Sequence, residues 1–230
     1  MTIPRFVPAC LLASILAASA SAQVLVHQWR FGENDPGATN GGTVTTTQDN
    51  VGTLDLTVSG TVTYTNVTAG ASSTLAQSFG TAASFSAAAD TSLSRTSRFV
   101  IEGWFYLNGT QANTTNILFY NGNASSSGAG LYVRGTTLRY LQGGSADVVA
   151  GTLTANQWNY VALAYEAGSL KVFVNGETTP SYAGAHTFNA FNGNTETFSI
   201  GSGLDVSVDE LNVWTFSGSF NSAMLSYDTV

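Results

Sequence analysis

Apolar and polar residues alternate along much of the chain, and the most informative segment is residues 158–177, WNYVALAYEAGSLKVFVNGE. The alternation predicts two extended strands joined by a turn at residues 166–169, where Gly168 can take a positive φ. The return strand ends at Asn175-Gly176, a strong hairpin signal. The first strand is apolar on both faces, which is typical of a strand inside a sandwich with a second layer over it. This segment therefore predicts architecture, and it names no reaction.

Similar short apolar segments recur along the rest of the chain and are separated by turns rich in Gly, Ser and Asn. Together with the hairpin they give about twelve predicted strands at a spacing typical of a sandwich or barrel. A helical turn is predicted at residues 220–227. The other predicted strands are residues 24–31, 54–58, 62–64, 75–79, 83–85, 99–107, 117–120, 130–134, 138–141, 198–201 and 206–214.

The N-terminus has the pattern of a secretory signal peptide. Arg5 precedes an uncharged apolar run over residues 6–18, and Ala20-Ser21-Ala22 fits a small-x-small cleavage site. The run is too short for a membrane anchor. We therefore expect residues 1–22 to be removed and residues 23–230 to form one domain, soluble and located outside the cell or in the cell envelope. Cys10, the one cysteine, lies inside the signal peptide.

Composition narrows the classes of partner. Only 9% of the residues are charged, and the net charge is -7 with seven basic residues in all. So few basic side chains cannot build a groove that follows phosphates, which argues against a nucleic-acid partner. No second apolar run of membrane length is present. An acidic surface is compatible with calcium and with neutral sugars.

Four stretches in order resemble the laminin G-like (LamG) group of the concanavalin A-like lectin/glucanase superfamily. They are LVHQWRFGE (residues 25–33), RFVIEGWFYL (98–107), the hairpin at 158–177, and IGSG followed by VDELNVW (200–214). Many members carry His-His after the hairpin Trp, where Asn159 and Tyr160 stand here, and that pair is structural in the family. The resemblance implies an all-β, antiparallel jelly-roll β-sandwich that usually serves as a binding or adhesion module. The same fold also hosts glycosidases and inert modules.

The resemblance also implies a metal site. Members of the superfamily often bind a structural calcium where the end of the first strand meets the last strand, and the matching positions are Glu33 and Asp209. Calcium prefers carboxylate and carbonyl oxygens, which a polar loop beside a strand Asp can supply. The alternative is that Asp209 bonds to a neighbouring turn and Glu33 is solvated. Zinc is disfavoured, because His27 and His186 are the only histidines and the mature chain lacks cysteine.

No catalytic residue is predicted. The glycosidase branch of this fold carries a Glu-x-Asp-x-x-Glu motif on one strand, and retaining hydrolysis needs two carboxyls about 5 Å apart on one face. That motif is absent from the chain. Strand alternation places Asp205 and Asp209 on one face and Glu210 on the other. Glu102, alone in an apolar strand, is expected to be a satisfied structural carboxylate.

Aromatic side chains near turns are candidates for stacking on sugar rings. We predict carbohydrate contacts at Tyr120, Tyr132, Tyr140 and Tyr182, whereas the four tryptophans lie within predicted strands and are expected in the core. The expected function is thus a secreted, non-catalytic binding or adhesion module for a polysaccharide or glycosylated surface. A glycan hydrolase or lyase of the same fold, and a structural cell-surface or matrix protein, are the alternatives.

Overall fold

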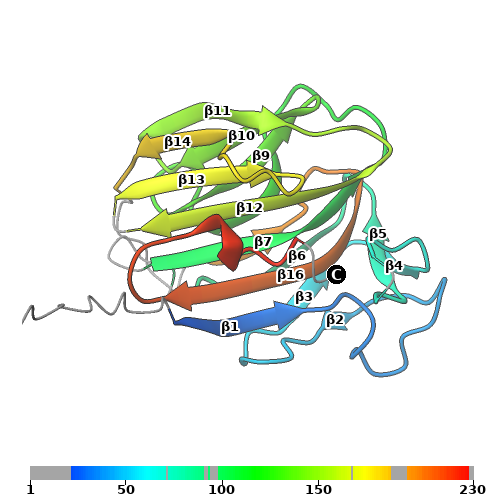
Figure 1. The fold of residues 1–230 in the computed structure, drawn as a ribbon. Coiled ribbons are helices and arrows are strands. Elements are labelled where there is room, and N and C mark those ends of the chain that lie inside the picture. Colours follow the sequence, from blue (N-terminus) through cyan, green and yellow to red (C-terminus); the bar gives the residue numbers. More distant parts are fainter. Residues whose placement is uncertain are drawn as a thin grey trace, which may run out of the picture.

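A computed structural model describes residues 22–70, 72–90, 93, 98–166, 168–187 and 196–227. Two antiparallel sheets face each other as a sandwich (Figure 1), which confirms the predicted fold class. The predicted signal peptide lies outside the described residues apart from Ala22. None of the helices in these ranges has the length and apolar character needed to span a membrane.

Within the described residues, each sheet has eight strands. The first sheet has the order β14 (Tyr182–Ala185), β13 (Ser169–Val174), β12 (Trp158–Glu166), β7 (Arg98–Leu107), β16 (Val206–Phe216), β5 (Ala76–Phe79), β4 (Val62–Thr65), and β1 (Gln23–Trp29) also pairs with β16. The second sheet has the order β11 (Ala146–Thr152), β10 (Thr137–Gln142), β9 (Ala129–Arg134), β8 (Asn116–Gly122), β15 (Thr197–Ile200), β6 (Ser84–Ala88), β3 (Leu56–Ser59), β2 (Thr46–Thr47).

The predicted hairpin is confirmed as β12 and β13, which pair from Val161–Val174 to Glu166–Ser169. The predicted helical turn is a short 3-10 helix, η1 (Ser222–Met224). Three strands were not predicted, namely β2, β11 and β14, and each lies at the edge of a sheet. β2 has only two residues, and β11 and β14 bury few of their side chains, so their sequences carry a weak apolar pattern.

The main core lies between the sheets and is rich in aromatic side chains. Trp29 is fully buried and stacks on Phe198 with ring centroids 5.4 Å apart. Phe85 makes edge contacts with Phe31 and Phe79 at 5.6 and 5.1 Å. Such pairs add to the stabilisation that area burial provides. The core joins strands from both sheets and fixes the frame on which the loops are built.

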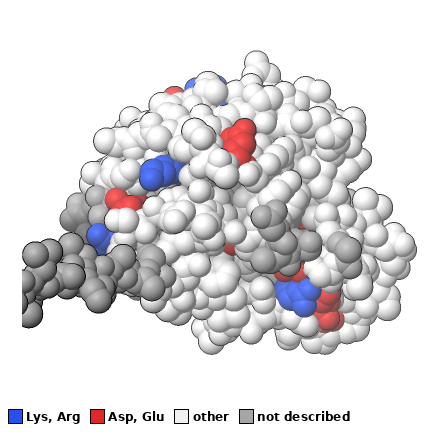
Figure 2. All heavy atoms as spheres, in the orientation of Figure 1, with Lys and Arg blue, Asp and Glu red and all other residues white. Residues whose placement is uncertain are grey.

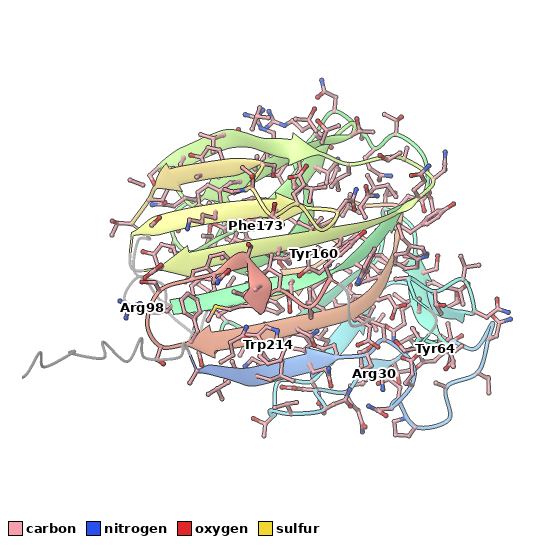
Figure 3. All side chains as sticks on the ribbon, viewed as in Figure 1. Arg30, Tyr64, Arg98, Tyr160, Phe173 and Trp214 are labelled. Carbon is pink, nitrogen blue, oxygen red and sulfur yellow. The ribbon has the colours of Figure 1, made fainter. Side chains whose placement is uncertain are left out.

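A second apolar cluster lies on the outer face of the first sheet, away from the main core. Tyr160 and Phe173, from β12 and β13, belong to it, and Trp214 of β16 packs against it (Figure 3). Residues 217–227, called here the C-terminal segment, cover this cluster with Phe220, Met224, Leu225 and Tyr227. Figure 1 shows η1 in front of β7 and β12. The second layer predicted over one face of the hairpin is therefore this segment, while the other sheet covers the opposite face.

Glu102 holds the C-terminal segment to the sheet. Its side chain is fully buried on β7 and accepts four hydrogen bonds. Oε1 accepts from Trp214 Nε1 and Ser226 Oγ, both at 2.6 Å. Oε2 accepts from the Tyr160 hydroxyl and from Ser226 N at 3.1 Å. The prediction of a satisfied structural carboxylate is confirmed, and neutral donors satisfy it.

His27 joins three parts of the fold through both ring nitrogens. Nδ1 lies 2.5 Å from Asp49 Oδ2, and Nε2 lies 3.1 Å from Asp90 Oδ2. A neutral imidazole has one N–H, so two carboxylate partners require the protonated form. Burial opposes protonation, but the hydrogen bonds and charges of Asp90 and Asp49 outweigh it and raise the pKa of His27. The ring thus carries a positive charge between β1 and two loops.

We expect His27→Gln to destabilise the fold by about 2 kcal/mol at pH 6, since charge-assisted hydrogen bonds contribute about that much. Because the folded pKa is raised, the contribution is full below the ordinary value and is lost as the pH rises through the folded one. Thermal unfolding from pH 5 to 9 checks this. A difference between wild type and variant that does not shrink with rising pH would contradict it. His186, whose pKa is lowered by burial, serves as the internal reference in an NMR titration.

Candidate metal centre

A β-bulge in β16 brings two consecutive acidic residues to one place. The pairing with β7 changes register between Asp209 and Asn212, and Glu210 takes a left-handed φ of 48°. Consecutive residues of a regular strand point to opposite faces, and a bulge removes that alternation. Opposite the bulge stands Gly103, where an added Cβ would lie 2.7 Å from the Leu211 side chain. Glycine at this position therefore makes room for the bulge.

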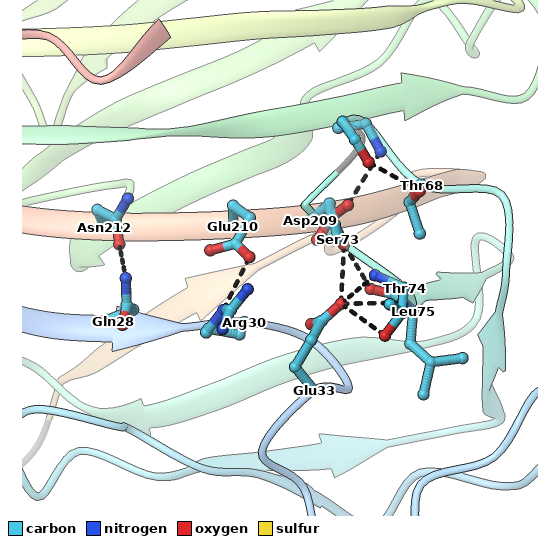
Figure 4. A network of polar contacts seen from close by, with 12 residues as sticks. Gln28, Arg30, Glu33, Thr68, Ser73, Thr74, Leu75, Asp209, Glu210 and Asn212 are labelled. Atoms are coloured by element: carbon cyan, nitrogen blue, oxygen red, sulfur yellow. Dashed lines mark hydrogen bonds and ion pairs between the residues drawn. The ribbon is translucent and has the colours of Figure 1, made fainter. Parts of the chain in front are cut away.

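The loop after β1 supplies a third carboxylate. Phe31 has a φ of 51°, and at Gly32 an added Cβ would lie 2.4 Å from Leu75 Cβ, so the chain needs glycine to pass this close. Glu33 Oε1 then accepts hydrogen bonds from Thr74 N at 2.6 Å and Leu75 N at 2.9 Å (Figure 4). These bonds fix Glu33 beside β16. One carboxylate oxygen each from Glu33, Asp209 and Glu210 lie within 4.8 Å of one another.

Asp209 is the most deeply buried of the three carboxylates. Its oxygens accept from Ala69 N at 3.0 Å and from the Ser73 hydroxyl at 3.1 Å. Burial, together with the charges of Glu210 and Glu33, raises the pKa of Asp209 to about 7. The carboxylate is thus costly to ionise unless a cation joins it.

Arg30 is the cation of the site. Its Nε lies 2.9 Å from Glu210 Oε1 (Figure 4). Burial nevertheless raises the pKa of Glu210, because the loss of hydration outweighs the attraction of Arg30. With one arginine against three carboxylates, the site keeps an excess of negative charge when all three ionise.

These residues fit a hard divalent cation. Glu33 Oε2 is buried and lacks a hydrogen-bond partner among the described residues. The donors are all oxygens, which calcium prefers over nitrogen and sulfur. The predicted pair Glu33 and Asp209 does come together here. Glu210 was placed on the opposite face because strand alternation gives no sign of a bulge, although the Asp-Glu dipeptide in the strand marks the place.

Three of the four predicted sugar-contacting tyrosines lie buried. Tyr120, Tyr132 and Tyr140 are each at most 2% exposed. Their hydroxyls bond to protein groups, for example Tyr120 to Ser127 O at 2.9 Å. Tyr182 is partly exposed, and its hydroxyl lies 2.7 Å from His186 Nε2. These three rings are therefore not exposed at the surface, and Tyr140 belongs to the main core between the sheets.

Tyr132 shows how such a ring is covered on an outer face. Arg134 and Arg139 lie over the ring at 5.3 and 6.0 Å from its centroid. The hydroxyl donates to Asp147 Oδ1 at 2.6 Å, and Arg139 Nε lies 2.8 Å from the same oxygen. The two arginines cover the ring on which a sugar would stack, and Arg139 also pairs with Asp147. A sugar-binding role for the four tyrosines stays a prediction.

The tryptophans are divided between core and surface layers. Trp29 is in the main core as predicted, whereas Trp104, Trp158 and Trp214 are only partly buried. Trp104 stacks on Tyr227 at 5.4 Å, and Trp158 meets Tyr106 edge-on at 5.7 Å. Figure 2 shows that charged side chains are sparse on the face of the molecule that carries the C-terminal segment.

The family model Laminin_G_3, described as Concanavalin A-like lectin/glucanases superfamily, matches residues 79–219, more than half of the chain. The chain therefore belongs to this superfamily, as its sequence suggested. No curated protein matches the sequence.

Solved structures with the same fold include sugar-bound proteins. Domain 4 of AbnA, an extracellular arabinanase from Geobacillus stearothermophilus, in complex with arabinotriose, has a TM-score of 0.65 at 18% identity, over 90% of this chain and 98% of that one. Trypanosoma rangeli sialidase with sialic acid has a TM-score of 0.59 at 16% identity, over 89% and 33%. The binding domain of botulinum neurotoxin DC with SialylT has a TM-score of 0.60 at 12% identity, over 86% and 49%. The chain thus spans almost all of the first, about a third of the second and half of the third.

Proposed function

We propose that the chain is a secreted, non-catalytic module that binds a polysaccharide or a glycosylated surface. Residues 1–22 serve as its signal peptide and residues 23–230 as the binding domain. The acidic site formed by Glu33, Asp209 and Glu210, called here the acidic centre, holds calcium in a structural role. The ion would supply charge neutralisation, while the carboxylates tie the end of β1 to β16.

The observation that carries the proposal is the match in fold to almost the full length of a domain that has been seen with a neutral trisaccharide. A match of that extent concerns a complete binding unit rather than a shared fragment. The sparse charge of the outer surface supports the same ligand class, because neutral sugars require hydroxyl and aromatic contacts more than ion pairs.

The state of the acidic centre supports a non-catalytic role. Asp209 is fully buried, and the loop that carries Ala69 and Ser73 donates hydrogen bonds to it. Glu33 is held by backbone N–H groups of that loop. A glycosidic bond must reach both carboxyls to be hydrolysed, and the Asp209 side chain is fully buried.

A glycan hydrolase is the second candidate, and a specific observation favours it. The acidic oxygens lie within 4.8 Å of one another, close to the spacing of a retaining glycosidase, and Asp209 has a pKa raised to about 7, as a general acid would. An enzyme of this kind would lose its turnover in Asp209→Asn. A purely structural matrix role is the remaining alternative, and it predicts no glycan binding.

A glycan array probed with wild-type protein tests the proposal. We expect retention on neutral polysaccharides and oligosaccharides in the presence of calcium, with at least tenfold weaker retention on sialylated glycans. Binding to none of the glycans, with the protein folded and calcium present, would contradict it. The Asp209→Asn variant, measured at 20 °C, tests whether the acidic centre has a structural role. The loss of a structural ion should lower the melting temperature more than it changes glycan selectivity.

A further inference from the structure

A groove runs between the loop after β13 and the C-terminal segment. It has a volume of about 330 Å³, at the lower end of the range for small-molecule sites. A second hollow of about 460 Å³ follows along the same loop and shares Glu177 and Thr178 with the first. The two hollows therefore adjoin at these residues. The lining of the first is Gly176, Glu177, Thr178, Ser222, Ala223, Leu225 and Tyr227.

The wall formed by the C-terminal segment is rigid. Ser226 is bonded to the buried carboxylate of Glu102 through both its backbone N–H and its hydroxyl. Tyr227 stacks on Trp104 at 5.4 Å. Asn221 caps η1 by accepting from Ala223 N at 3.0 Å. A wall held this way is organised before any ligand arrives, which lowers the cost of binding.

Tyr160 anchors both walls. Its backbone N–H donates to Asn175 Oδ1 at 2.9 Å, and its carbonyl accepts from Asn175 N at 3.0 Å. Its ring meets Tyr227 edge-on at 5.3 Å. Gly176 then passes against Tyr227 so closely that an added Cβ would lie 2.4 Å from the ring. The two sides of the groove are thus fixed relative to one another by one residue of β12.

The lining has the chemistry that a neutral sugar needs. The Leu225 side chain and the part of the Tyr227 ring that Trp104 and Gly176 leave uncovered offer apolar surface, which suits the C–H face of a pyranose or furanose. Thr178 and Ser222 carry hydroxyls, and the exposed carboxylate of Glu177 accepts hydrogen bonds. Among the described residues that line the two hollows, none is a lysine or an arginine. A carboxylate without a basic neighbour repels acidic sugars, so the charge selects neutral ones.

We propose that this groove is the glycan-binding site and that it takes a neutral oligosaccharide of at least two units, one in each hollow, with Glu177 and Thr178 between them. This inference rests on the proposed function and adds the place and the ligand class. We expect the groove to disfavour sialylated glycans, because its described lining has no lysine or arginine to pair with a sialic acid carboxylate.

Calorimetric titration of folded protein with arabinotriose, xylotriose, cellotriose and sialyllactose tests the inference. Thr178→Trp places a bulky ring at the junction of the two hollows on an exposed position, and we expect at least tenfold weaker binding of the preferred neutral trisaccharide. Glu177→Gln keeps the shape and removes the charged acceptor, with an expected weakening of about threefold. The matched control is Thr81→Trp, which places the same ring in a separate hollow of about 400 Å³ formed by residues 60–61 and 80–83.

The outcomes are distinguishable. Binding that is lost in Thr178→Trp and kept in Thr81→Trp supports the groove, provided that both variants melt like wild type. Binding by wild type that Thr178→Trp leaves unchanged overturns the groove and leaves the proposed function intact. Preference for sialyllactose overturns the charge argument. Failure of the wild type to bind any of the four, or any glycan on the array, overturns the proposed function and the groove with it.

Discussion

Glu102→Ala is expected to lower the free energy of unfolding by roughly 3–5 kcal/mol. The substitution leaves Trp214 Nε1, the Tyr160 hydroxyl and Ser226 without their shared acceptor. Each unsatisfied buried donor costs about 1–3 kcal/mol, and a cavity adds to that. The substitution also removes the two hydrogen bonds by which Ser226 attaches the C-terminal segment to β7. Urea denaturation measures the change.

Two further variants show whether the hydrogen bonds carry the effect. Glu102→Gln keeps the volume but turns an amide N–H toward other donors, so we expect a loss of about 2–3 kcal/mol. Glu177→Ala, at an exposed glutamate on the same side of the molecule, should change stability by less than about 0.5 kcal/mol. If Glu102→Ala also changed the free energy of unfolding by less than this amount, the C-terminal segment would not be held by this carboxylate.

Calcium is expected to raise the stability of the wild type by about 2.7 kcal/mol at a concentration a hundredfold above its dissociation constant. For a domain of this size that corresponds to a rise in melting temperature of roughly 5–10 °C. Asp209→Asn should abolish most of the rise, because the ion loses a central carboxylate of the acidic centre. Asp205→Asn, which alters a carboxylate four residues earlier that bonds to Asn108, should keep it. Differential scanning calorimetry in calcium and in EDTA measures both.

The pH dependence of this effect follows from Asp209. Without calcium, a pKa raised from 3.8 to about 7 means that the folded state binds the proton more tightly than the unfolded state does. That contribution to stability is full below the ordinary value and is lost as the pH rises to about 7. Protons and calcium compete for the same carboxylate, so the stabilisation by calcium should grow from pH 5 to pH 8. If calcium raised the melting temperature of wild type and of Asp209→Asn by the same amount, the proposal of calcium at this site would be contradicted.

The fold was predictable from sequence because the apolar residues of its central strands recur in a clear pattern on the faces that become buried. The hairpin of β12 and β13 and the long strands β7 and β16 were all found, since each buries apolar side chains in register with neighbours on both sides. What covers the outer face was not predictable. The apolar outer face of β12 required a second layer, but local alternation cannot say that residues 217–227 fold back to provide it.

The candidate site was predicted in part for a similar reason. The resemblance placed Glu33 and Asp209 together, whereas Glu210 joined them through a bulge that depends on Gly103 across the sheet. A long-range requirement of this kind leaves no mark on the period-two pattern. Three of the four tyrosines are buried because the groups that cover them come from elsewhere in the chain, such as the two arginines over Tyr132. Accessibility is a tertiary property, and proximity to a turn does not determine it.

The most direct test of the account is to incubate the wild-type chain, in calcium, with the neutral polysaccharides used to measure its binding, and to quantify bound protein and released reducing ends in the same samples. We predict saturable binding with no release of reducing ends above the level of a denatured control. Release that rises with time and disappears in Asp209→Asn would identify a hydrolase and contradict the account, and so would the absence of binding to every neutral polysaccharide.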